Sequence, residues 1–209
     1  MATNGQGLLI IACGALAREI AALREVNRWM AVDVRCLPAE LHNRPEKIPG
    51  AVRELIRSSR QQYRSIFVAY GDCGTGGRLD EVLREEGVER IPGAHCYEFY
   101  ATSGVFAGLA EAEIGTFYLT DFLLRHFDRL VVKGLGLDRH PELFSTYFGH
   151  YRKLVYLAQA PAAEAEERAR AIARQMGLDF EFRRTGYGGL AASLAAAVER
   201  NQEAAAWVH

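Results

Sequence analysis

Short apolar runs that alternate with amphipathic segments constrain the fold of this chain more than any other feature. Residues 8–12 form a continuous apolar run, which is typical of a strand buried on both faces. Residues 15–27 follow with apolar positions at spacings of three and four, which predicts a helix. The alternation recurs, with further strands expected at 30–37, 65–70, 88–91, 153–158 and 178–183 and further helices at 51–63, 79–86, 161–176 and 189–207.

Alternating strands and helices form parallel sheets with right-handed crossovers. We therefore predict an α/β fold, with an open, mostly parallel sheet of about six strands and helices on both faces. Residues 95–151 interrupt the alternation with an aromatic-rich pattern that predicts a helical insertion. With 209 residues, we expect a single domain over 1–209. A two-lobed alternative has strand–helix units at 1–94 and 152–209 and the insertion at 95–151.

Charge and hydropathy exclude several classes of partner. The net charge is −1, and no block of like charges offers a basic surface for nucleic acid or an anionic membrane. The apolar run at residues 8–13 is too short to cross a bilayer, and residues 1–7 lack the basic and apolar regions of a signal peptide. We therefore expect a cytoplasmic protein with neither nucleic acid nor membrane as a partner.

Four cysteines occupy comparable places in the predicted sheet. Cys13 directly follows the first strand, Cys36 ends the second, Cys73 lies in the loop after the third, and Cys96 comes shortly after the fourth. Carboxyl ends of parallel strands meet at one edge, where open α/β sheets hold their sites. Because a reducing compartment keeps thiols free, this pattern indicates a metal site or a nucleophile rather than disulfides. Taken singly, each cysteine could equally be a small buried hydrophobic residue.

A cluster of thiolates and imidazoles is typical of a zinc site, and four thiolates suit an iron–sulfur cluster. We predict that Cys13, His42, Cys73 and Cys96 form the ligand set. Cys36 is the doubtful member, because its position inside a strand end could point it into the core. No Cys-x-x-Cys spacing is present as a local metal signature. Three protein ligands on zinc would leave an open position for water or a substrate thiolate.

Cys13 also has a metal-free interpretation. It precedes a predicted helix, whose partial positive charge lowers the pKa of a thiol and favours the reactive thiolate. Cys13 would then be a nucleophile, with His42 or His95 as the base. Both interpretations stay open at the level of the sequence.

The loop at residues 71–77 is rich in glycine and opens a helix. Its backbone N–H groups could cradle a phosphate or carboxylate, which makes Gly71, Gly74 and Gly76 candidate cofactor-binding residues. The loop matches neither the nucleotide P-loop nor the dinucleotide fingerprint. The alternative is a tight turn that needs positive φ. Arg184 follows the last predicted strand and is a further candidate for binding an anion.

Three other titratable residues lie in the aromatic segment. Asp121 is surrounded by aromatic and apolar residues, where burial would raise the pKa of its carboxyl group and make it an acid or base. The alternative for Asp121 is a polar position on an exposed stripe. His140 and His150 flank an aromatic helix, and we expect both to be structural.

Four short motifs together resemble an uncharacterised family of bacterial and archaeal proteins, catalogued as a domain of unknown function. The motifs are Ala12-Cys13-Gly14, Leu41-His42-Asn43-x-Pro45, Tyr70-Gly71-Asp72-Cys73-Gly74 and His95-Cys96-Tyr97-Glu98. Members of that family are common in methanogens and in bacteria that use methylamines or betaines, and they are often encoded near corrinoid methyltransferases. The resemblance covers nearly the whole chain. It implies a link to one-carbon metabolism, and it supplies no catalytic residue.

Three functions are compatible with these observations. The first is a methyl-handling enzyme of the methyltransferase type, in which a thiolate-ligated metal activates a nucleophile and aromatic residues cover a methylammonium, pterin or corrinoid group. The second is an accessory protein that binds a metal or cofactor for a corrinoid methyltransferase without turnover. The third is a metal-free enzyme with Cys13 or Cys73 as nucleophile. The partner is accordingly a small-molecule substrate, a methyltransferase or a corrinoid protein, and the aromatic segment could also form a homo-oligomer interface.

Overall fold

The computed structural model describes residues 7–206. Within them the chain divides into two units, and each has a parallel sheet of its own. Unit 1 comprises residues 7–99 and 189–206, and unit 2 comprises residues 100–188. Residues 1–6, for which the sequence predicts no signal peptide, and Trp207, the predicted end of the last helix, lie outside the described residues.

Unit 1 contains a four-stranded sheet with the order β2-β1-β3-β4, in which all neighbours are parallel. Its strands are β1 (Leu8–Cys13), β2 (Val32–Leu37), β3 (Ser65–Ala69) and β4 (Glu89–Arg90). Its helices are α1 (Ala17–Val26), α2 (Ile48–Ser59), α3 (Arg78–Glu86), the start of α4 (Cys96–Ala101) and nearly all of α9 (Gly188–Ala206). Short 3-10 turns lie at Gly14–Leu16, Ala39–Asn43 and Pro45–Lys47.

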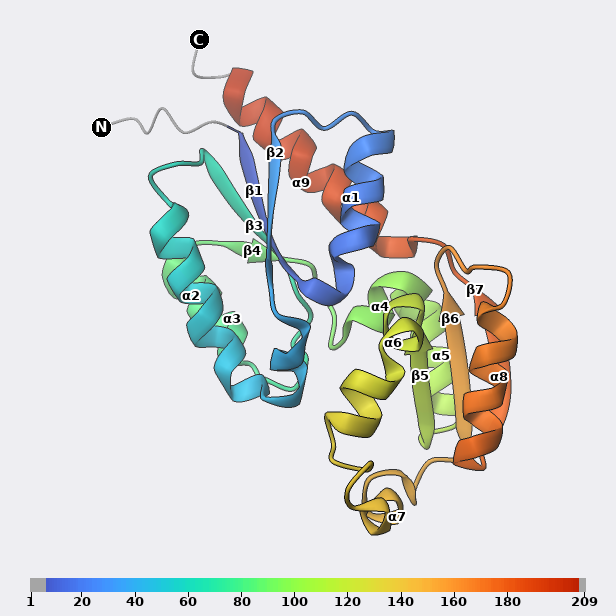
Figure 1. The fold of residues 1–209 in the computed structure, drawn as a ribbon. Coiled ribbons are helices and arrows are strands. Elements are labelled where there is room, and N and C mark those ends of the chain that lie inside the picture. Colours follow the sequence, from blue (N-terminus) through green and yellow to red (C-terminus); the bar gives the residue numbers. More distant parts are fainter. Residues whose placement is uncertain (1–6, 207–209) are drawn as a thin grey trace. The chain divides into compact units, whose positions relative to one another are not determined.

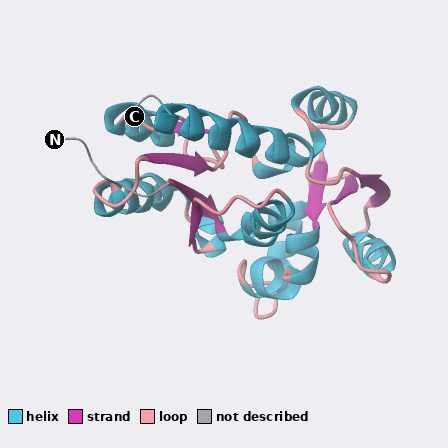
Figure 2. Ribbon diagram, turned by 90° about the horizontal axis from the view of Figure 1, so that it is seen from above, coloured by secondary structure: helices cyan, strands magenta, loops and turns pink. Residues whose placement is uncertain are grey.

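Helices cover both faces of the sheet in unit 1 (Figure 1 and Figure 2). Helices α1 and α9 lie on one face, where Ser65 of β3 donates a hydrogen bond to Asn201 of α9 at 2.6 Å. Helices α2 and α3 lie on the other, where Arg35 of β2 donates to Ser59 of α2 at 3.0 Å. Strand β1, which has neighbours on both sides, is buried along its whole length. This double coverage is why its sequence is continuously apolar.

Helix α2 begins at Ile48 rather than at the predicted residue 51. In the structure Pro49 occupies the first turn of the helix, where its missing N–H costs no hydrogen bond. The end of α3 agrees with the prediction, because Gly87 adopts the left-handed conformation at φ 63° and caps the helix.

Unit 2 contains a three-stranded parallel sheet with the order β5-β6-β7. Its strands are β5 (Thr116–Thr120), β6 (Lys153–Ala158) and β7 (Asp179–Arg184). Its helices are α5 (Ser103–Ala112), α6 (Asp121–Arg125), α7 (Phe144–Phe148) and α8 (Ala165–Met176), with a π-helical turn at Asp128–Lys133 and a 3-10 turn at Pro141–Leu143. Aromatic residues fill much of the core, and Phe117 meets Phe127 and Phe148 edge to face.

The α/β class, the parallel pairing and the helices beside the sheets agree with the sequence prediction. The structure differs in dividing the strands between two sheets rather than placing them in one. The segment 95–151, predicted to be a helical insertion, contains strand β5, which pairs with β6. Residues 116–120 form a run too short for periodicity to separate a strand from a helix turn. Strand β7 lies at the edge of its sheet.

Asp121 is buried at the end of β5, which excludes the exposed-stripe interpretation. Its carboxylate accepts hydrogen bonds from the Tyr156 hydroxyl at 2.7 Å and from the backbone N–H groups of Gln159 and Ala160 at 3.3 and 2.7 Å. Gln159 returns a hydrogen bond by accepting from the Asp121 N–H at 3.0 Å. The carboxylate therefore connects the end of β5 to the end of β6 through hydrogen bonds.

Replacing Asp121 with asparagine is expected to lower the free energy of unfolding by about 3 kcal/mol, because an amide N–H₂ would face groups that are themselves donors. Urea unfolding followed by circular dichroism measures the change. Tyr156→Phe is the matched control, since it removes one of the three donors and should cost about 1 kcal/mol. An Asp121→Asn variant as stable as the parent would contradict a structural role for the carboxylate.

Candidate functional site

The strand order of unit 1 places a topological switch point between β1 and β3. From β1 the chain first adds β2 on one side, then crosses to add β3 and β4 on the other. Helices that leave in opposite directions open a crevice there, at the carboxyl ends of the strands, where open α/β sheets bind ligands. Cys13 is the last residue of β1, and Cys73 lies in the loop after β3. Two of the four cysteines therefore flank the expected ligand position.

Three cysteines converge at this place. Cys13, Cys73 and Cys96 are all buried, and each interacts electrostatically with the other two. They arrive from three separate strand ends, because Cys96 begins α4 after β4. The structure thus brings together the three thiols that the sequence predicts to meet, and all four cysteines of the chain are free.

Backbone hydrogen bonds hold the segment around Cys73 against the segment before Cys96. The N–H groups of Asp72 and Cys73 donate to the carbonyls of Gly93 and Ala94 at 3.1 and 2.8 Å. Gly71 permits this approach, since a Cβ added there would lie 3.1 Å from backbone atoms of His95. The close contact between two loops therefore positions Cys73 beside Cys96.

Backbone N–H groups are directed at the sulfur atoms. Ala15 donates to Cys13 Sγ at 3.5 Å, and the N–H groups of Gly71 and Cys96 are directed at the Cys73 thiol. Such donors stabilise a thiolate and recur around metal-bound cysteines.

Burial nevertheless dominates the titration of the three thiols. It raises the pKa of Cys13, raises the pKa of Cys73 to about 12, and raises the pKa of Cys96 well above its ordinary range. The expectation that a helix start lowers the pKa of Cys13 is therefore wrong, because burial outweighs the hydrogen bond from Ala15. At neutral pH these thiols carry their protons.

Tyr70 is the residue of this site that the sequence analysis missed. Its side chain is 1% exposed, and its hydroxyl approaches the Cys13 thiol with the O–H as the donor. Within residues 7–206 that hydroxyl has no hydrogen-bond partner of standard geometry, and neither does the buried Nδ1 of His95. Buried polar groups without partners are uncommon and often mark a functional position. The signal available in the sequence was the place of Tyr70 directly after a buried strand.

His42 lies in the 3-10 turn that follows β2 and interacts with His95. Burial lowers the pKa of both imidazoles, so both are neutral near pH 7 and each has one unprotonated nitrogen, the form that binds a metal. Cys36 is exposed rather than turned into the core, and it is within electrostatic range of Cys13. The expectation that its strand position could point Cys36 into the core is therefore wrong.

The side chains as placed do not surround an ion. Among the described residues, no group of three or more histidine, cysteine, aspartate or glutamate side chains is arranged to hold a metal. The chemistry of the three thiols suits a soft metal ion, while their present spacing does not enclose one. The ligand roles of Cys13, His42, Cys73 and Cys96 stay predictions.

The glycine-rich loop is organised by Asp72. Its carboxylate accepts from the N–H groups of Gly76 and Gly77 at 3.1 and 2.9 Å and from the Thr75 hydroxyl at 2.6 Å. Gly74, Gly76 and Gly77 all have positive φ. The positive φ of Gly74 and Gly76 supports the tight-turn interpretation. The Gly76 N–H is already donated to Asp72, and that of Gly71 is directed at Cys73. The cofactor-binding roles of Gly71, Gly74 and Gly76 stay predictions. Arg184 is exposed at the end of β7 in unit 2, and its binding of an anion stays a prediction.

Unit 1 is therefore a parallel α/β unit with a buried cysteine cluster at its switch point. Residues 36–194 match the family model described as "Protein of unknown function (DUF1638)", and the chain belongs to this family. The matched region contains His42, Cys73 and Cys96, whereas Cys13 precedes it.

No curated protein matches the chain. Among solved structures it is similar to ornithine carbamoyltransferase from Pyrococcus furiosus, with 16% identity and a TM-score of 0.28. That similarity covers 87% of this chain and 55% of the other, so the chain spans about half the length of that enzyme. In the described part of the chain, every helix is too short or too polar to span a bilayer.

Proposed function

We propose that this protein binds a thiolate-ligated metal centre, either a zinc ion or an iron–sulfur cluster, through Cys13, Cys73 and Cys96. One observation carries the proposal. Three buried thiols from three strand ends interact with one another at the switch point of a parallel sheet. Core packing does not favour the carboxyl edge of a sheet over other buried positions, whereas parallel sheets bind their ligands at that edge.

The surroundings of the thiols support a thiolate site. Backbone N–H groups directed at Cys13 and Cys73 and the nearby Tyr70 hydroxyl are the donors that a negatively charged metal–thiolate centre needs. Binding would require the thiol side chains to rearrange around the metal, since their present arrangement among the described residues does not enclose one. When bound, zinc would lower the pKa of a coordinated thiol or water and prepare it as a nucleophile.

The fourth position on the metal has two candidates. His42 is the ligand expected from the sequence, and as a neutral imidazole it is competent to bind. The other candidate is an exogenous thiol or water, which three protein ligands would leave room to accept.

The metal-free nucleophile is the weaker candidate. A cysteine nucleophile acts as the thiolate, and the raised pKa values of Cys13 and Cys73 leave little thiolate at neutral pH. A metal ion would displace those protons on binding, so the same burial is compatible with a metal site.

We further propose that the protein acts in methyl-group or one-carbon metabolism in the cytoplasm. Its support is the family resemblance, together with free thiols that suit a reducing compartment. Either the protein is an enzyme of the methyltransferase type, or it is an accessory partner of a corrinoid methyltransferase. Turnover of a methyl donor by the purified protein would favour the enzyme. Metal binding without turnover would favour the accessory role.

Metal content tests the proposed function directly. The protein is purified without a metal-affinity column under anaerobic conditions, then measured by elemental analysis and visible absorption. About one zinc per chain supports a zinc site, and broad brown absorbance supports an iron–sulfur cluster. Protein that contains no metal, takes up no zinc from solution and assembles no cluster when supplied with iron and sulfide would reject the proposal.

Replacing Tyr70 with phenylalanine is expected to have opposite effects on stability and metal binding. Without metal, the variant should be more stable by about 1 kcal/mol, because it lacks a buried hydroxyl that has no hydrogen-bond partner of standard geometry within residues 7–206. Zinc affinity should fall by roughly 10-fold, because the donor beside Cys13 is lost. Thermal unfolding and competition with a chelating dye measure the two effects. Tyr63→Phe is the control, because Tyr63 bonds to Asp33 instead.

A further inference from the structure

We propose that a second copy of this chain pairs with β2 in antiparallel orientation about a two-fold axis at Val34. Two four-stranded sheets would then form one continuous sheet. Strand β2 is the edge of the sheet in unit 1, and within residues 7–206 no strand pairs with its outer side. It is six residues long and has neither a proline nor a bulge, two of the features that protect natural edge strands from pairing.

The backbone of β2 has the geometry for this pairing. Leu8 donates its N–H to the Ala31 carbonyl at 2.9 Å, and Leu8 is in register with Val32. In a parallel ladder this means that Asp33 and Arg35 direct their backbone groups toward β1. The N–H and C=O groups of Val32, Val34 and Cys36 therefore point outward, where a second strand can bind them. With the axis at Val34, Val34 faces its own copy as a hydrogen-bonded pair.

The charges of β2 are complementary in this register. An axis at Val34 sets Asp33 opposite Arg35 of the second copy, and the symmetry repeats the pair on the other side of the axis. Both side chains lie on the α2 face, where the Tyr63 hydroxyl donates to Asp33 at 2.9 Å and the Arg35 guanidinium lies over the Tyr63 ring. Directly opposite pairs of unlike charge stabilise antiparallel strands.

Neighbouring registers are disfavoured by the same charges. An axis at Asp33 would set two aspartates opposite each other, and an axis at Arg35 would set two arginines opposite each other. Like charges in such positions are destabilising. An axis at Val32 or Cys36 would leave part of the strand without a partner. The sequence Asp33-Val34-Arg35 therefore selects the axis at Val34.

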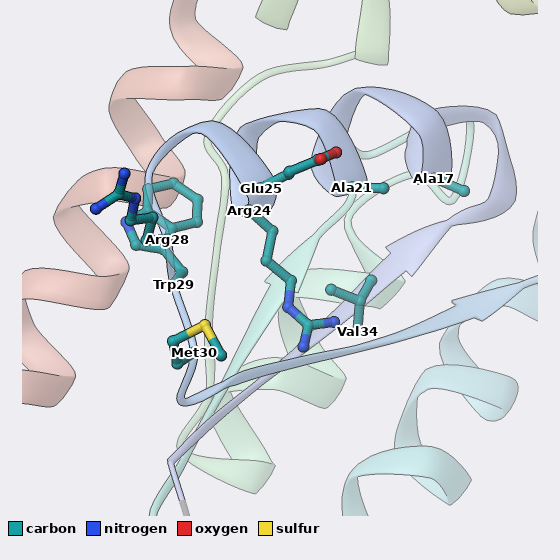
Figure 3. Close-up of a pocket in the computed structure, with 8 residues that line it drawn as sticks. All are labelled: Ala17, Ala21, Arg24, Glu25, Arg28, Trp29, Met30 and Val34. Carbon is teal, nitrogen blue, oxygen red and sulfur yellow. The ribbon is translucent and has the colours of Figure 1, made fainter.

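The other face of the same edge has an open cavity of about 360 Å³ between α1 and β2. Its lining combines apolar side chains, among them Ala17, Ala21 and Val34, with the charged side chains of Arg24, Glu25 and Arg28. Figure 3 shows the Arg24 side chain extending from α1 toward Val34 across this space. At its end, Met30 is 86% exposed and extends the apolar part of this surface. The second copy's Val34 and α1 would cover this surface.

Charge reversal tests the proposal on the full chain. Asp33→Arg and Arg35→Asp should each weaken the dimer by roughly 10-fold or more, because each replaces unlike pairs by like pairs. The double variant should recover the parent's dissociation constant, since the pairs are restored with their order exchanged. Analytical ultracentrifugation measures the constants, and circular dichroism confirms that each variant is folded. A monomeric parent protein, or a double variant no tighter than the single ones, would overturn the proposal.

Cross-linking tests the register independently. In a Cys36→Ser background, Val34→Cys would place two thiols across the axis, with Cα atoms about 5.5 Å apart and within the range of a disulfide. Mild oxidation should then give a covalent dimer. The parent's Cys36 and its copy would be roughly 14 Å apart along the strands and should give none. A covalent dimer through Cys36, or none through Val34→Cys, would overturn the register.

Discussion

Replacing Cys73 with serine is expected to lower the affinity for zinc by more than about 100-fold. Substituting a residue that only hydrogen-bonds to a metal ligand already lowers metal affinity by about 10–100-fold, and Cys73 is proposed as a ligand itself. Cys73 interacts with both Cys13 and Cys96, so its loss removes one of three mutually interacting thiols. Cys13→Ser and Cys96→Ser should have effects of the same order. Competition with a chelating dye gives the affinities, and elemental analysis gives the stoichiometry.

Cys36 provides the matched control for that experiment. It lies at the same edge of the sheet and is chemically identical, yet it is exposed on β2 rather than buried in the cluster. Cys36→Ser should therefore change the affinity by less than about 3-fold. If all four substitutions weaken zinc binding equally, the metal is bound by a different set of residues. If none does, the buried thiols are packing groups.

In the absence of added metal, the free energy of unfolding is expected to fall as the pH rises above about 9. Burial raises the pKa of Cys73 from its ordinary 9.0 to about 12. Between those values the unfolded thiol loses its proton while the folded thiol keeps it, so the folded state binds more protons. Stability is therefore fully present below pH 9 and is lost toward pH 12, by up to roughly 1.4 kcal/mol per pH unit for each such thiol.

Urea unfolding between pH 8 and about 10.5 measures this dependence. Lysines and tyrosines also titrate at the upper end of that range, so the informative quantity is the difference between the parent and Cys73→Ser. The variant should lose stability less steeply, because serine does not ionise. Identical slopes would mean that Cys73 is not buried as a thiol. Saturating zinc should reverse the trend, because binding favours the deprotonated ligands.

These two predictions separate burial from metal binding. The pH dependence follows from the buried position of the thiols alone. The loss of affinity requires in addition that the thiols act together on one ion. A chain that shows the first effect without the second would have a buried cysteine cluster that serves packing.

The strand–helix order and the edge at which the cysteines lie could be predicted from the sequence because both are local properties. A continuous apolar run such as residues 8–12 indicates a doubly covered strand, and strand direction follows from the chain itself. Cys13, Cys73 and Cys96 each follow a strand, so their shared edge required no knowledge of which strands are neighbours.

Strand partners and burial, by contrast, were decided only by the tertiary structure. Periodicity carries no information on which distant strand completes a sheet, so the pairing of β5 with β6 and the division into two sheets could not be read from residues 116–120. The same holds for the position of β2 at an edge. The pKa of Cys13 depends on how much of the folded chain covers it, and for that reason local reasoning from the helix start predicted the wrong direction.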